Sequence, residues 1–138
     1  MKEKNRFSFK YLLLSLFCSF LLSFGLLILV SYTFYSTNYS WIFFIGLIGF
    51  WYWLYKSRDV KRIWGRTFIG LSIESLALPI AIFIFTVIFA TKQSDAIQGV
   101  GAFIGGGIAT IFTGFLSFFF GAIMLIAGIF ILRSVKKD

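Results

Sequence analysis

Three long apolar runs and one shorter run alternate with polar segments along the chain. Nearly all charged residues lie between or outside the runs, so each run is apolar all round and not on one helical face only. About 20 such residues are needed for a helix to cross the hydrocarbon core of a bilayer. We therefore predict four transmembrane helices, over residues 9–33, 39–56, 66–91 and 98–133.

The second run is the weakest candidate for a membrane span. From Trp41 to Tyr55 it offers only 15 clearly apolar residues, so residues 35–40 have to add a turn for the helix to reach membrane length. Trp41 stands at one end, and a group of aromatic side chains stands at the other. Aromatic belts of this kind are typical of the two membrane interfaces.

The composition agrees with this reading. The chain has 138 residues, of which 59% are hydrophobic and 13% are charged, whereas a soluble domain carries roughly 25% charged residues. The first run is longer than the apolar part of a signal peptide and ends without a small-residue cleavage site, so we expect it to be retained. We predict an all-α integral membrane protein, with a four-transmembrane-helix bundle as a single domain over residues 1–138.

Positive charge is distributed very unevenly between the two predicted sides of the membrane. Of the 13 Lys and Arg residues, 12 fall in the N-terminal segment, the middle loop and the C-terminal segment, and only Lys92 falls on the other side. The positive-inside rule then places both termini in the cytoplasm, as expected for a multi-pass protein of the plasma membrane. Because the positive residues cluster at membrane edges, the net charge of +8 does not indicate nucleic-acid binding.

The middle loop, residues 56–66, is the most basic segment of the chain. Positive side chains near a membrane surface attract anionic lipid headgroups by about 1 kcal/mol each. A topology signal alone also explains them. The candidate headgroup-binding residues are Lys56, Arg58, Lys61, Arg62 and Arg66.

Glu74 is the only ionisable residue deep inside any apolar run. It lies about 10 Å along the helix from Thr67, where the uncharged part of the third run begins. Small residues, including Gly70, share its helical face, so we expect it to point into the bundle as a neutral carboxylic acid. An intramembrane carboxyl group is by default a functional candidate, here for a proton or a cation. The alternative is a hydrogen bond to a serine that only fixes packing.

Three serines are the candidate partners of Glu74. Ser15 and Ser19 lie in the first run at a depth similar to the one assigned to Glu74. Ser75 is adjacent, and its carbonyl group is crowded by the ring of Pro79, four residues later. The predicted proton or cation site therefore comprises Glu74, Ser75, Ser15 and Ser19.

Glycine recurs every seven residues in the fourth run, with small or flexible residues between. Such a repeat leaves a straight groove along a helix and allows a neighbouring helix to approach closely. The neighbour can belong to the same chain, to a second copy or to another membrane subunit. The predicted helix-packing residues are Gly107, Thr110, Gly114, Ser117, Gly121 and Gly128.

Few residue types capable of catalysis are present. Histidine is absent and Cys18 is the single cysteine, so we expect no metal site, no cofactor and no catalytic residues. We predict a non-catalytic structural or accessory membrane subunit, which packs with itself or with a larger complex. The alternative is a small proton- or cation-coupled transporter or channel that uses Glu74.

Overall fold

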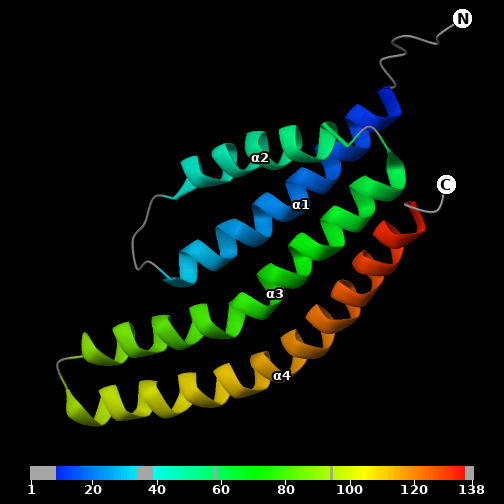
Figure 1. Ribbon diagram of the computed structural model, residues 1–138. Helices are drawn as coiled ribbons and strands as arrows, with labels where there is room; N and C mark the ends of the chain where they lie inside the picture. Colours follow the sequence, from blue (N-terminus) through cyan, green and yellow to red (C-terminus); the bar gives the residue numbers. More distant parts are fainter. Residues whose placement is uncertain (1–8, 34–38, 58, 94, 136–138) are drawn as a thin grey trace, which may run out of the picture.

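The computed structural model describes residues 9–33, 39–57, 59–93 and 95–135, and this part of the chain is helical without any strand. It forms four helices (Figure 1): α1 (Phe9–Thr33), α2 (Ser40–Tyr55), α3 (Val60–Thr91) and α4 (Ala96–Val135). The prediction of an all-helical chain with four helices is confirmed. Helices α1, α3 and α4 are long and apolar enough to cross a membrane, whereas α2 has only 16 residues. Of residues 35–40, which were expected to add a turn to α2, residues 35–38 lie outside the described residues, and the helix begins at Ser40.

Helix α3 begins earlier than the apolar pattern indicates, at Val60 and not at residue 66. Asp59 is the reason, because its side chain caps the helix by accepting a hydrogen bond of 3.1 Å from the backbone N–H of Lys61. The second half of the basic segment is therefore helical. Pro79 lies inside α3, and the helix continues through it to Thr91.

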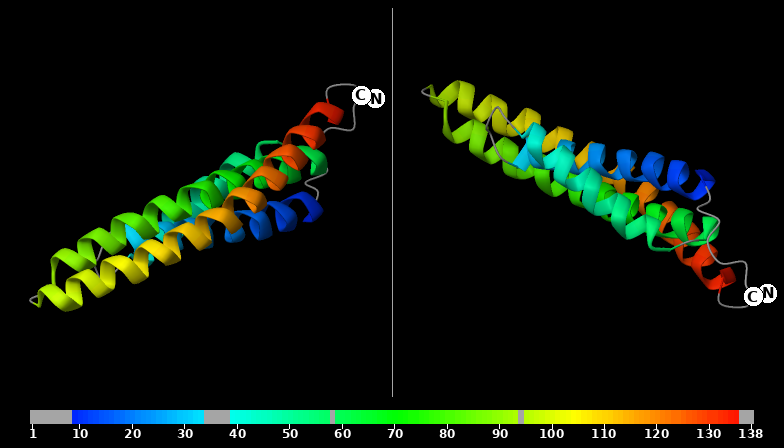
Figure 2. Two further views of the ribbon diagram at one scale, coloured as in Figure 1. Left: turned by 90° about the horizontal axis from the view of Figure 1, so that it is seen from below. Right: turned by 90° about the horizontal axis from the view of Figure 1, so that it is seen from above.

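The helices form a row in the order α2, α1, α3, α4 (Figure 1). In the described part of the chain, α4 lies against α3 alone, so the four helices do not close round a common centre. The starts of α1 and α3 and the ends of α2 and α4 share one end of the molecule, and the α3–α4 hairpin projects beyond α1 and α2 at the other (Figures 1 and 2).

A small core lies where α1, α2 and α3 meet. Its fully buried side chains include Cys18 and Leu22 of α1, Leu54 of α2 and Ile63 of α3. Ser15, Ser19 and Ser23 of α1 are also fully buried, and each hydroxyl group donates to a carbonyl oxygen three or four residues earlier in its own helix. Small side chains that satisfy their own hydrogen bonds allow neighbouring helices to approach closely.

The glycine repeat of α4 faces α3, and α3 has a matching repeat of its own. A Cβ atom added to Gly128 would lie 3.0 Å from the carbonyl oxygen of Gly65. One added to Gly121 would lie 3.4 Å from the carbonyl oxygen of Ser72. Two antiparallel seven-residue repeats thus meet within one chain, along a line that we call the α3–α4 seam: Gly65, Ser72, Pro79 and Thr86 of α3 opposite Gly128, Gly121, Gly114 and Gly106 of α4.

The last pair of the seam, Thr86 and Gly106, departs from the predicted glycine repeat, which contains Gly107 and not Gly106. Gly107 has no non-neighbouring atom within 4 Å of an added Cβ, whereas a Cβ at Gly106 would overlap the side chain of Thr86. A straight α-helix drifts by about 20° per seven residues relative to an exact seven-residue repeat. After three repeats from Gly128 that drift has turned Gly107 away from α3 and brought Gly106 to face it.

Candidate functional site

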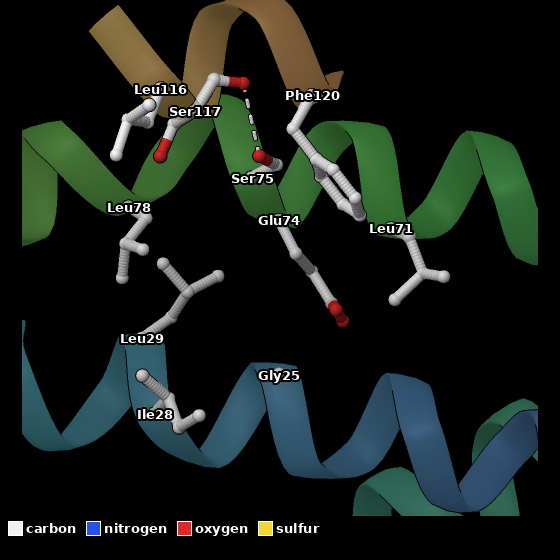
Figure 3. Close-up of a pocket in the computed structure, with 10 residues that line it drawn as sticks. All are labelled: Gly25, Ile28, Leu29, Leu71, Glu74, Ser75, Leu78, Leu116, Ser117 and Phe120. Atoms are coloured by element: carbon white, nitrogen blue, oxygen red, sulfur yellow. Dashed lines mark hydrogen bonds between the residues drawn. The ribbon is translucent and has the colours of Figure 1, made fainter. Parts of the chain in front are cut away.

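An open groove of about 520 Å³ lies where α1, α3 and α4 flank one another (Figure 3). All three helices contribute to its walls, although α1 and α4 do not pack against each other. Most of the lining is apolar. The apolar side chains are Ile28, Leu29, Leu71, Leu78, Leu116 and Phe120.

Glu74 is the ionisable residue that lines the groove, and it projects from α3 towards Gly25 of α1 (Figure 3). A Cβ atom at Gly25 would overlap its carboxyl group, coming within 2.9 Å of Cδ. The missing side chain at Gly25 thus makes the space that the carboxyl group occupies. One turn earlier, Gly70 makes similar room for Leu22, since a Cβ there would lie 2.6 Å from Leu22 Cδ2.

The carboxyl group of Glu74 is incompletely satisfied. Its Oε2 atom is buried and has no hydrogen-bond partner within the described chain. The neighbouring hydroxyl group of Ser75 donates instead to the carbonyl oxygen of Ser117 at 3.0 Å (Figure 3). A buried polar atom without a partner is costly to folding, and in a native structure it calls for a specific explanation.

Ser15 and Ser19 do not join this site. They donate to the carbonyl oxygens of Leu12 and Leu16, at 3.0 Å and 2.8 Å. We expected Ser15 and Ser19 to lie level with Glu74. This was wrong, because α1 and α3 run parallel but are shifted along their axes relative to each other, so that a later part of α1 lies beside Glu74. Glu74 meets Gly25, which lies about 9 Å further along α1 than Ser19 and about 15 Å further than Ser15.

Four of the predicted packing residues lie against α3. Gly121 and Gly128 do so, and Gly114 faces the ring of Pro79. A Cβ atom added to Gly114 would lie 3.6 Å from the Cβ atom of Pro79, an ordinary van der Waals distance. Ser117 is buried and accepts the bond from Ser75. The hydroxyl group of Thr110 bonds to the carbonyl of Gly106 within α4.

The basic residues lie near the end of the molecule where α3 begins. Arg66 donates a hydrogen bond of 2.9 Å to the carbonyl oxygen of Trp53, and its guanidinium group lies 5.2 Å from the centre of the Trp53 ring. It therefore joins α3 to α2. Arg62 lies 4.0 Å from the carboxylate of Asp59. Lys56 and Lys61 have exposed side chains, and Arg58 lies outside the described residues.

The site also contains residues that the sequence did not single out. Gly25, Leu71 and Phe120 line the groove, but a glycine or a leucine in an apolar run carries no distinguishing pattern. Only the offset between α1 and α3 brings Gly25 to Glu74. No group of three or more Cys, Asp or Glu side chains within the described residues is close enough to hold a metal ion. A single carboxyl group in an apolar groove can bind a proton or one cation.

Comparison with known protein families, with curated proteins and with solved structures finds no match to this chain.

Proposed function

We propose that this is a small multi-pass protein of the cell membrane in which Glu74 binds a proton or a cation, as part of a coupled transport cycle. The observation that carries the proposal is the Oε2 atom of Glu74, which is buried against Gly25 without a hydrogen-bond partner, in a residue that lines an open groove. A purely structural role for Glu74 requires a hydrogen bond that fixes packing. The carboxyl group lacks that bond at Oε2, and this favours the transport function over the accessory-subunit function.

The charge distribution supports the proposed orientation. Lys10, Lys61 and Arg133 lie at the end of the molecule where α1 begins, and Lys92 lies at the opposite end (Figure 1). The further positive residues of the two terminal segments lie outside the described residues. We propose that the end with α1 faces the cytoplasm. Reporter fusions at residue 95 test this, and cytoplasmic activity of such a fusion would refute it.

Proteoliposomes with a pH gradient test the transport function. The vesicles enclose a pH-sensitive dye, and Na⁺, K⁺ or an organic ammonium salt is added outside. We expect the wild type to collapse the gradient in the presence of its cation, and Glu74→Gln to do so at least tenfold more slowly. Gln keeps the shape of the side chain but cannot titrate. Equal rates for the two proteins and for empty vesicles would refute the proposal.

A second function keeps one specific observation in its favour. Helix α4 contacts α3 alone in the described chain, so apolar side chains such as Ile111 and Phe130, each 76% exposed, surround the rest of it. An accessory subunit would present such a surface to another membrane protein, although lipid covers it equally well. Chemical cross-linking from α4 in native membranes tests this function, because a subunit gives a discrete heteromeric product and a lipid-facing helix gives none.

A further inference from the structure

The groove beside Glu74 has the size and lining of a site for a small organic molecule. Its volume of about 520 Å³ falls within the range of roughly 300–1,000 Å³ typical of such sites. Its walls are mainly aliphatic, with Phe120 as the aromatic member, and polar groups are few. Sites of this kind take a ligand with an apolar body and fix its orientation through one or two polar contacts.

The ionisable group that the groove provides is the carboxyl group of Glu74, which is either anionic or neutral, and the groove offers no positively charged side chain. No Lys or Arg lines it. The nearest arginine before Glu74 on α3 is Arg66, about 12 Å earlier along the helix, and its guanidinium group is bound to Trp53. Because the hydroxyl group of Ser75 donates its hydrogen bond to the carbonyl oxygen of Ser117, it is not a donor to Glu74 either. A cation from outside the chain would give the Glu74 carboxylate the partner that it lacks.

A bare metal ion does not suit these walls. Hard cations such as Ca²⁺ and Mg²⁺ take about six or more oxygen ligands. The groove provides the carboxyl group of Glu74 and the polar atoms of Ser75 and Ser117, and its other walls are apolar. An ammonium ion needs far fewer contacts. It also gains from an aromatic face, and the Phe120 ring and the Glu74 carboxyl group project into the same space (Figure 3).

The position of the groove indicates the route by which a ligand reaches it. It lies beside α3 between α1 and α4, two helices that do not pack against each other. In the proposed orientation this opening faces acyl chains, about 10 Å inside the point where the uncharged part of α3 begins. A ligand that arrives by this route first has to partition into the bilayer.

We propose that the groove binds an amphiphilic ammonium ion, which enters from the membrane with its charged head paired to Glu74 and its apolar chain lying among the apolar side chains of the groove. This inference rests on the proposed function, since it names the cation that Glu74 binds. It excludes inorganic cations and uncharged lipids as the preferred occupant.

Binding to the protein in nanodiscs tests the inference, with empty nanodiscs as the reference for partition into lipid. The probes are dodecyltrimethylammonium, dodecanol, which keeps the chain but lacks the charge, and tetramethylammonium, which keeps the head but lacks the chain. We expect saturable binding of the first and at least tenfold weaker binding of the other two. Equal binding of dodecanol, or tighter binding of tetramethylammonium, overturns the inference.

Three variants connect the binding to this groove. Glu74→Gln should weaken the binding of dodecyltrimethylammonium at least tenfold, while Ile73→Ala, at an exposed neighbouring position outside the groove, should leave it unchanged. If Glu74→Gln does not fold, Leu116→Trp serves instead. It fills the groove from a half-exposed position, keeps Glu74, and should also weaken binding at least tenfold. Unchanged affinity in a folded Glu74→Gln or Leu116→Trp protein overturns the inference.

The two proposals fail separately. Glu74-dependent collapse of the pH gradient by Na⁺ or K⁺, without saturable binding of dodecyltrimethylammonium, overturns the inference and leaves the transport function standing. Glu74-dependent binding of dodecyltrimethylammonium without any gradient collapse supports the site and overturns the transport function.

Discussion

The two faces of α3 are built in opposite ways. Towards α4, small residues every seven positions bring the backbones so close that a Cβ atom at Gly128 would lie 3.0 Å from a carbonyl oxygen of the other helix. Towards α1, around Glu74, the helices leave a groove of about 520 Å³ and a buried carboxyl oxygen without a partner. The first face follows the rules for stable helix packing, and the second departs from them. Such departures concentrate at functional sites.

Gly121→Leu tests the tight face and has the largest expected effect. A Cβ atom at this position already lies 3.0 Å from Leu76 Cγ and 3.4 Å from the Ser72 carbonyl oxygen, so the larger side chain forces α3 and α4 apart. We expect a loss of about 1–3 kcal/mol in the free energy of unfolding, typical of overpacking, measured by thermal unfolding in detergent. The matched control is Gly107→Leu, where nothing lies within 4 Å. Equal melting temperatures would show that the seam is not a packing face.

Gly25→Ala tests the open face. The added methyl group overlaps the Glu74 carboxyl group, which lies at the free end of a flexible side chain and can rotate away. We expect dodecyltrimethylammonium to bind about tenfold more weakly, or about 1.4 kcal/mol, with little change in melting temperature. Gly49→Ala, at a position with open space, should change neither quantity. A large loss of stability in Gly25→Ala with unchanged binding would mean that this contact serves packing.

Ser72→Ala gives a smaller effect on the tight face. The hydroxyl group of Ser72 donates a buried hydrogen bond of 2.8 Å to the carbonyl oxygen of Gly121, across the seam. Hydrogen bonds between membrane helices contribute about 0.6 kcal/mol on average, and we expect a loss of that size in chemical unfolding. Ser31→Ala is the control, because the Ser31 bond is exposed and stays within α1. If the two variants lose the same stability, the bond across the seam adds nothing.

Arg66→Lys has the smallest expected effect and concerns the side of α3 that meets α2. Lysine keeps the charge but loses the planar group that both stacks on Trp53 and bonds to its carbonyl oxygen. We expect a loss of about 0.5 kcal/mol, the lower end for an exposed cation–π pair, measured by thermal unfolding. Arg62→Lys, whose 4.0 Å ion pair with Asp59 lies at the surface, should have no measurable effect. Equal stability of both variants would contradict a role for Arg66 in joining α2 and α3.

The features that the sequence predicts well are those determined within one helix. The four helices follow from apolar runs, and Glu74 is conspicuous because it is the only charge inside one of them. The early start of α3 also had a local signal, since Asp59 is a good N-cap residue followed by a helical stretch.

Features that depend on how far one helix is shifted along its axis relative to its neighbour could not be predicted from the pattern within each helix. Depth counted from each run's own beginning placed Ser15 and Ser19 beside Glu74, but helices of unequal length need not begin at the same level. The contact between Gly25 and Glu74 fixes the true offset, and a single sequence carries no signal for it. The exchange of Gly107 for Gly106 is a subtler case, because a seven-residue repeat keeps its register only if the two helices supercoil, and the repeat alone does not show whether α4 does so or stays straight.

The unequal helix lengths have a consequence for the membrane itself. Helix α2, with 16 residues, is about 24 Å long, whereas α4, with 40 residues, is about 60 Å long, and the hydrocarbon core measures about 30 Å. Once inserted, the protein is too short for the bilayer on one flank and too long on the other. Lipid beside α2 has to thin, while the α3–α4 hairpin has to tilt or emerge from the far surface. In the proposed membrane orientation, bilayer thickness would therefore affect how this protein tilts and where its helix ends lie.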